Sequence, residues 1–428
     1  YSMLPLIIFV LLCGFYTSWN IGANDVANAV GPSVGSGVLT LRQAVVIAAI
    51  FEFFGALLLG DRVAGTIESS IVSVTNPMIA SGDYMYGMTA ALLATGVWLQ
   101  LASFFGWPVS TTHSIVGAVI GFGLVLGKGT IIYWNSVGII LISWILSPFM
   151  GGCVAYLIFS FIRRHIFYKN DPVLAMVRVA PFLAALVIMT LGTVMISGGV
   201  ILKVSSTPWA VSGVLVCGLL SYIITFYYVH TKHCSYISDT PKKGSLTYRL
   251  KERGGNYGRK YLVVERIFAY LQIIVACFMA FAHGSNDVAN AIAPVAGVLR
   301  QAYPASYTSY TLIRLMAFGG IGLVIGLAIW GWRVIETVGC KITELTPSRG
   351  FSVGMGSALT IALASILGLP ISTTHVVVGA VLGIGLARGI RAINLNIIKD
   401  IVLSWFITLP AGALLSILFF FALRALFH

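Results

Sequence analysis

The chain has 428 residues, of which 58% are hydrophobic and only 9% are charged, whereas charged residues make up roughly a quarter of a soluble globular domain. This composition excludes a soluble domain and predicts an all-α polytopic membrane protein, because backbone groups in lipid must be hydrogen-bonded within their own segment. The formal charge of +13 does not indicate a nucleic-acid partner, because many of the basic residues gather in two connections between apolar segments.

Apolar runs of about 20 residues, each long enough to cross a hydrocarbon core of about 30 Å as a helix, recur along the chain. In chain order they are 3–20, 41–60, 84–106, 137–162, 174–196, 208–230, 265–282, 309–330, 351–369 and 395–423. Residues 3–20 lack the basic start and the cleavage site of a signal peptide, so we expect a helix of the mature protein. Four shorter runs, each of which follows a polar motif, predict half-helices or re-entrant segments: 26–39, 114–127, 288–299 and 376–387. We expect about 10–12 transmembrane helices.

Two connections are rich in basic residues. One holds Arg163, Arg164 and Lys169, and the other is the long polar segment 232–264. The positive-inside rule places both connections in the cytoplasm, separated by the two crossings 174–196 and 208–230. The six cysteines are scattered without a C-x-x-C pair, so we expect no disulfide framework, and nothing predicts an organic cofactor.

The chain is internally duplicated. The segment "GANDVANA" at 22–29 returns as "GSNDVANA" at 284–291, and "PVSTTH" from Pro108 returns as "PISTTH" from Pro370, both at an offset of 262 residues. We therefore divide the chain into repeat 1 (1–165), two linking helices (166–231), a basic loop (232–264) and repeat 2 (265–428). Interrupted polar segments at matching positions of two repeats are typical of inverted-repeat transporters. If each repeat crosses the membrane an odd number of times, the two repeats are inverted relative to each other. Both termini then lie outside the cell.

The Asn-Asp pair of each repeat lies inside apolar sequence, where an ionised carboxylate persists only when it is paired or faces a polar cavity. Lys and Arg are absent from matching positions nearby, so a bound cation is the simplest partner. Carboxylate and amide oxygens, with carbonyls freed by a helix break at Gly22 and Gly284, suit an alkali ion such as sodium. The alternative is a helix N-cap. The predicted ligands in these motifs are Asn24, Asp25, Asn28, Asn286, Asp287 and Asn290.

The Pro-x-Ser-Thr-Thr-His motif of each repeat predicts a helix start, where hydroxyl groups and free backbone N–H groups favour an anion. The candidate oxyanion ligands are Ser110, Thr111, Thr112, Ser372, Thr373 and Thr374, together with Asp25 and Asp287. The alternative is ordinary capping of the helix by Ser or Thr. His113 and His375 are either proton carriers or neutral rings that donate to a backbone carbonyl.

A cavity that holds cations beside an anion predicts a cation-coupled anion symporter. Phosphate keeps at least one proton at neutral pH and can donate it to an ionised Asp, whereas sulfate would be repelled. An intramembrane hydrolase that used Ser110, His113 and Asp25 would not need these groups twice, and a passive channel would not need buried aspartates. We therefore expect a transporter of inorganic phosphate and not an enzyme.

The doubled G-[AS]-N-D-V-A-N-A and P-[VI]-S-T-T-H motifs resemble those of the inorganic phosphate transporter family, in the same order and over nearly the whole chain. The resemblance implies an inverted-repeat fold in the cell membrane, outside termini, a homodimer and, in many members, sodium as the coupling ion. It also implies that the Asn-Asp and Ser-Thr-Thr segments form the substrate and ion sites. Proton coupling is the alternative, and transport of another oxyanion such as sulfate is a further one.

Two more polar residues are predicted to bind sodium. Glu52 and Gln100 lie in the apolar runs 41–60 and 84–106, and Glu52 looks like the buried glutamate that family members carry in this helix. Pairing with another polar side chain is the alternative. Leu323 and Ala362 stand at the aligned places of repeat 2, so sodium sites that include Glu52 and Gln100 would be asymmetric.

Overall fold

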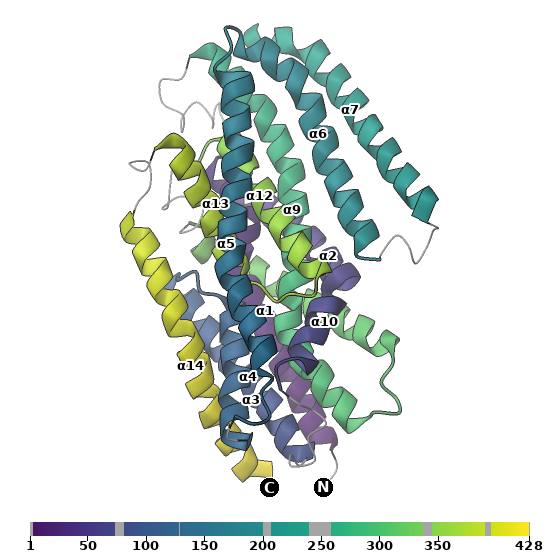
Figure 1. Ribbon diagram of the computed structural model, residues 1–428, viewed down its shortest axis with the longest axis vertical. Helices are drawn as coiled ribbons and strands as arrows, with labels where there is room; N and C mark the ends of the chain where they lie inside the picture. Colours follow the sequence, from purple (N-terminus) through teal and green to yellow (C-terminus); the bar gives the residue numbers. More distant parts are fainter. Residues whose placement is uncertain are drawn as a thin grey trace.

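The computed structural model describes residues 3–72, 81–127, 129–199, 207–238, 258–336, 345–389 and 395–427, and within these ranges the regular structure is helical (Figure 1). Ten of the helices are long and apolar enough to cross a membrane. They are α1 (Leu4–Gly35), α2 (Leu41–Ser69), α3 (Ser81–Phe105), α5 (Trp134–Ile162), α6 (Pro172–Ser197), α7 (Thr207–Ser238), α9 (Arg259–Ala302), α10 (Ser309–Trp330), α12 (Pro347–Ile366) and α14 (Leu395–Phe427). Each of the ten predicted crossings is confirmed.

The outer surface of the bundle is apolar. Ile145 on α5, Trp209 on α7 and Phe406 on α14 are each 76% exposed, and a soluble protein would not leave so many large apolar side chains in water. These faces therefore suit the hydrocarbon of a bilayer. By contrast, the polar residues of both sequence motifs are buried in the interior of the bundle.

The four short segments have two different outcomes. Residues 114–127 and 376–387 do form short helices, α4 (Thr111–Gly127) and α13 (Thr373–Arg388), which are too short to cross comfortably. The prediction of separate half-helices at 26–39 and 288–299 is wrong, because α1 and α9 run through the Asn-Asp motifs without a break. Carbonyls freed by a helix break are therefore not available as ligands there.

Gly22 and Gly284 allow close packing of helices. A Cβ atom on Gly22 would lie 2.0 Å from the carbonyl oxygen of Leu323 on α10, and one on Gly284 would lie 2.1 Å from the carbonyl oxygen of Glu52 on α2. Small residues of this kind let two helix backbones touch. The contact also confirms that Glu52 and Leu323 occupy equivalent places in the two repeats.

We expect replacement of Gly284 by Ala to lower the free energy of unfolding by about 3 kcal/mol, because the added methyl group meets backbone and not a flexible side chain. Gly65→Ala on α2 is the matched control, since a Cβ atom there has no neighbour within 4 Å and the change should be neutral or slightly stabilising. Thermal unfolding of both variants in detergent measures the difference. Equal stability of the two variants would contradict the packing argument.

The two repeats run in opposite directions. In repeat 1 the chain passes through α1, α2, α3, α4 and α5, and in repeat 2 it passes through the equivalent α9, α10, α12, α13 and α14. The start of α1 lies beside the end of α14, where the rings of Phe9 and Phe427 are 6.5 Å apart. The start of α9 lies beside the short π-helix η1 (Arg163–Phe167) that ends repeat 1, where Phe167 stacks on Tyr261. Both chain termini lie at one end of the molecule (Figure 1), and the predicted inversion is confirmed.

The linking helices α6 and α7 pack against each other at one side of the bundle (Figure 1). The predicted basic loop 232–264 is partly helical, because α7 runs to Ser238 and α9 begins at Arg259. Its middle part, 239–257, lies outside the described residues. A further short helix among the described residues is α11 (Trp332–Glu336), after α10.

A glycine turn places the start of each short helix. Gly106 follows α3 and Gly368 follows α12, and both have a φ of +68°, which a residue with a side chain rarely adopts. The chain then reverses into the Pro-x-Ser-Thr-Thr motif, and the side chain of Ser110 or Ser372 caps the new helix. In this way both short helices begin inside the bundle.

Candidate functional site

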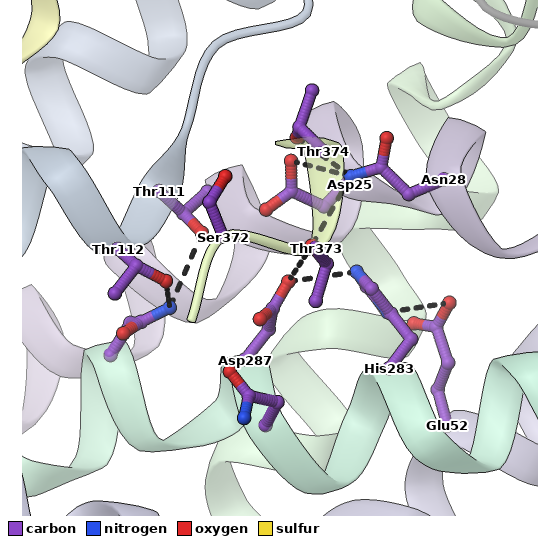
Figure 2. A network of polar contacts seen from close by, with 12 residues as sticks. Asp25, Asn28, Glu52, Thr111, Thr112, His283, Asp287, Ser372, Thr373 and Thr374 are labelled. Atoms are coloured by element: carbon purple, nitrogen blue, oxygen red, sulfur yellow. Dashed lines mark hydrogen bonds and ion pairs between the residues drawn. The ribbon is translucent and has the colours of Figure 1, made fainter. Parts of the chain in front are cut away.

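The two Asn-Asp helices meet the two short-helix starts in one buried polar network (Figure 2). On α1, the Asn28 side-chain amide donates to the hydroxyl of Thr373 over 3.3 Å and to that of Thr374 over 2.8 Å. The equivalent amide of Asn290 on α9 donates to the hydroxyls of Thr111 and Thr112, both over 3.2 Å. Each repeat therefore binds the threonine pair of the other repeat.

The segments before the two short helices also hold each other. The Thr112 hydroxyl donates to the carbonyl of Ile371 over 2.9 Å, and the Thr374 hydroxyl donates to the carbonyl of Val109 over 3.3 Å. These pairs are related by the same offset of 262 residues as the motifs. The helix N-termini of α4 and α13 are thus fixed relative to one another at the centre of the protein.

The two motif aspartates are close together and fully buried. The Thr373 hydroxyl donates to Asp287 Oδ2 over 2.8 Å, and the Asn28 amide donates to Asp25 Oδ1 over 3.4 Å. Ligand atoms of Asp25, Asp287 and His283 all lie within 4.8 Å of one another. Two ionised carboxylates this close repel each other in the interior, so the arrangement requires positive charge.

His283 supplies part of that charge and was missed by the sequence analysis. Its Nε2 lies 2.9 Å from Asp287 Oδ2, and its Nδ1 lies 3.2 Å from Glu52 Oε1 (Figure 2). When protonated, a ring in this position places positive charge between the two carboxylates. The sequence offered no Lys or Arg as a partner for the aspartates, and the structure places a histidine beside Asp287. The signal was present, because His283 directly precedes Gly284, but the equivalent residue of repeat 1 is Ile21, so the histidine is not part of the duplicated motif.

The charges of the network do not balance. Asp25, Glu52 and Asp287 carry three negative charges when ionised, and a protonated His283 offsets only one. Because all four side chains are fully buried, water cannot screen the remainder. The network therefore has room for two further positive charges, as metal ions or as protons.

Several oxygen atoms of the motif side chains are buried without a hydrogen-bond donor. The amide of Asn24 donates to Ser103 Oγ over 3.2 Å and to the Trp107 carbonyl over 3.1 Å, and the amide of Asn286 makes the equivalent bonds to Ser365 and Leu369. These bonds fix each amide and leave its oxygen unused. The unpartnered atoms are Oδ1 of Asn24, Asn286, Asn290 and Asp287, and Oδ2 of Asp25. Such oxygens are the ligands that hard cations prefer.

The remaining predicted residues lie around this network. Ser110 and Ser372 accept hydrogen bonds from the backbone N–H groups of His113 and His375, over 3.1 and 3.3 Å, so both serines are helix caps. Glu52 reaches the network through His283. Gln100 is half-buried on α3, and within the described part of the chain no hydrogen bond joins it to the network.

The two motif histidines pack behind the site. Their rings lie 4.4 Å apart, and each ring also contacts a tryptophan: His113 lies 3.8 Å from Trp144 and His375 lies 3.5 Å from Trp405. His113 Nδ1 lies 3.5 Å from the Trp405 carbonyl. This arrangement favours the neutral ring that donates to a carbonyl over the proton carrier.

An inverted repeat of membrane helices around a buried polar network defines a polytopic membrane transporter, and the comparisons specify which kind. The model of the phosphate transporter family matches residues 21–416. A putative phosphate permease of Chlamydia trachomatis is 65% identical, over 99% of each chain. The chloroplastic inorganic phosphate transporter 2-1 of Arabidopsis thaliana is 42% identical, over 96% of this chain and 70% of the relative. The chain therefore belongs to the phosphate transporter family and is not an enzyme.

The fold agrees with a solved structure of a protein described as the sodium-dependent phosphate transporter. The two structures align with a TM-score of 0.84 at 37% sequence identity, over 98% of this chain and 99% of the other. The family resemblance of the sequence motifs and the predicted fold class are thus confirmed.

Proposed function

We propose that this protein imports inorganic phosphate coupled to sodium, by alternating access. The observation that carries the proposal is that one hydroxyl group joins the two kinds of site. Thr373 at the start of α13 donates to Asp287 and accepts from Asn28. A cation at the carboxylates and an anion at the helix start would therefore each stabilise the binding of the other. The sodium dependence of the structural relative supports sodium as the coupling ion.

The phosphate would bind between the two short-helix starts. Backbone N–H groups and the positive ends of two helix dipoles favour an oxyanion there. Ser110, Thr111 and Thr112 would contact it from one repeat, and Ser372, Thr373 and Thr374 from the other. A phosphate that keeps a proton can donate a hydrogen bond to Asp25 or Asp287, and this discriminates against sulfate.

The sodium ions would bind to the unpartnered oxygens beside the phosphate. The unpartnered oxygens of the motif side chains are carboxylate and amide oxygens, which suit sodium, and the His283 ring lies beside them. Asn24, Asp25, Asn28, Asn286, Asp287 and Asn290 remain the proposed ligands. Glu52 would act by holding His283, and Gln100 has the weakest support because it lies outside the network.

Transport would follow from the neutralisation of buried charge. Sodium at Asp25 and Asp287 removes their repulsion and leaves the threonine hydroxyls free to turn toward the incoming phosphate. With both charges compensated, the loaded site can pass through a closed state and open at the other face. The inverted repeat supplies two arrangements of similar energy, one open to each side. We propose outside termini, a cytoplasmic end at η1 and the start of α9, and a homodimer in the cell membrane.

Proton coupling is the second candidate, and His283 between Glu52 and Asp287 is the observation that favours it. Radiolabelled phosphate uptake into proteoliposomes distinguishes the two, with an inward sodium gradient compared with an inward proton gradient at equal membrane potential. We expect accumulation with sodium and little with protons alone. Accumulation driven by protons without sodium would move the coupling to His283 and its carboxylates, and the absence of both would refute coupled transport.

A further inference from the structure

Each Asn-Asp helix contains a proline four residues after the last asparagine of its motif. Pro32 lies in α1 and Pro294 lies in α9, at the same offset of 262 residues as the motifs, and both are buried. In an α-helix the N–H group of residue i+4 donates to the carbonyl of residue i. Proline has no N–H group, and its ring pushes that carbonyl away. The main-chain carbonyls of Asn28 and Asn290 therefore lack their regular donors, although both helices continue.

These two carbonyls belong to residues of the polar network. The Asn28 side chain donates to Asp25 and to the Thr373–Thr374 pair (Figure 2), and the Asn290 side chain donates to the Thr111–Thr112 pair. Residues four apart lie on one face of a helix, so Pro32 and Pro294 lie on the faces that carry these asparagines. The proline in each helix thus frees a carbonyl beside the carboxylates and not elsewhere along the chain.

The freed carbonyls require a partner. Asn28 is 1% exposed and Asn290 is fully buried, and in a membrane bundle a carbonyl freed by proline is satisfied by neighbouring groups. Among the side chains that the structure describes, none donates to either oxygen. The neighbouring unpartnered atoms, Asp25 Oδ2 and Asp287 Oδ1, are acceptors as well. A group of buried acceptors without donors is satisfied by a cation.

The other interior prolines of the described helices do not share this placement. They are Pro148 on α5, Pro181 on α6 and Pro410 on α14. The residues four positions before them are hydrophobic and lie outside the network: Trp144, Val177 and Phe406. Pro181 is therefore a matched reference, because it is buried inside a helix but frees the carbonyl of a valine.

The proline turn of α1 is held rigidly by the other repeat. The Gln272 amide on α9 donates to the Pro32 carbonyl over 3.0 Å, and the Gln272 side-chain oxygen accepts the Ser36 hydroxyl over 3.0 Å. A Cβ atom on Gly350 of α12 would lie 2.0 Å from Gln272 Nε2, so this side chain has little room to turn. The end of α1 is thus fixed before any ion binds, and a fixed ligand binds an ion at a lower entropic cost.

We propose that Pro32 and Pro294 are positioning residues of the sodium sites, and that each presents the main-chain carbonyl of the preceding motif asparagine as a sodium ligand. A carbonyl adds a hard oxygen ligand without adding a negative charge to a network that already holds three carboxylates. The inference rests on the proposed sodium coupling.

Pro32→Ala and Pro294→Ala test the inference, because each restores an N–H group that takes back the carbonyl. The measurement is the unfolding temperature of the full chain in detergent over a series of sodium concentrations, with choline chloride holding the ionic strength constant. We expect the half-saturating sodium concentration of each variant to rise about tenfold, as for the loss of one neutral ligand. The unfolding temperature without sodium should not fall, because alanine favours a helix interior more than proline does. Pro181→Ala should keep the wild-type sodium response.

Sodium-driven phosphate uptake into proteoliposomes separates a ligand role from a hinge role. Prolines that served only as hinges would give variants with a lower maximal rate and an unchanged half-saturating sodium concentration, and this result would overturn the inference. Pro32→Gly and Pro294→Gly carry the same test if an alanine variant does not fold, because glycine restores the N–H group and still permits a bend. A wild type without any sodium response would refute sodium coupling and this inference with it. Variants that match a sodium-responsive wild type would refute the inference alone.

Discussion

Replacement of Asp287 by Asn is expected to lower the initial rate of sodium-driven phosphate uptake by about a hundredfold, which corresponds to the loss of a charged contact worth roughly 3 kcal/mol. The change is nearly isosteric, and the new amide oxygen can still accept the hydrogen bond from Thr373. It removes the negative charge that would bind sodium and that faces His283. Asp25→Asn on the equivalent helix should have an effect of similar size.

The measurement for Asp287 is uptake into proteoliposomes with matched protein content. Asp171→Asn is the control, because Asp171 is a half-exposed carboxylate that pairs with Lys260 at 3.6 Å, away from the network. It should retain the wild-type rate. Sodium-dependent accumulation that persisted in Asp287→Asn would remove this residue from the coupling mechanism.

Replacement of His283 by Gln is expected to lower the free energy of unfolding by about 3–5 kcal/mol, because it leaves two fully buried carboxylates without their positive partner. Thermal unfolding in detergent measures the change. Sodium should restore part of the lost stability, since a cation can take the place of the imidazolium. His165→Gln is the control, because His165 is exposed on η1.

A second substitution makes the His283 prediction specific. Glu52→Gln removes one of the two carboxylates, so the Glu52→Gln/His283→Gln variant should be more stable than His283→Gln alone. If the two changes were simply additive, the ion pair between Glu52 and His283 would not be the cause of the loss. A His283→Gln protein as stable as the wild type would contradict the whole argument.

The helices that face lipid could be predicted from the sequence. The hydrocarbon thickness sets the length of each apolar run, and backbone hydrogen bonding in lipid requires each run to be a helix. The sequence also located Asp25, Asp287 and both threonine pairs, since a duplicated polar motif in apolar sequence is rare. It did not reveal that Asn28 bonds to Thr374 of the other repeat as well as to Asp25 of its own, because the partner of a side chain across the bundle depends on the packing of α1 against α13.

Two failures have the same physical origin. Gly22 was expected to break a helix, but its lack of a side chain instead lets the backbone of α10 pack closely at Leu323. The local sequence does not show which residue lies opposite a glycine. His283 was passed over because its counterpart is Ile21. Comparison of two repeats finds what they share, whereas charge compensation in this site depends on a residue that they do not share.

The crosswise bonds between Asn28 and the Thr373–Thr374 pair, and between Asn290 and the Thr111–Thr112 pair, have a consequence for the origin of the protein. A shorter ancestor that encoded one repeat could have completed this network only by pairing with a second copy inserted upside down. Such an ancestor would have needed few basic residues to bias its insertion, so that both orientations were made. If duplication of such a gene fixed one copy in each orientation, a difference such as His283 against Ile21 could arise only afterwards, when the two copies no longer shared a sequence.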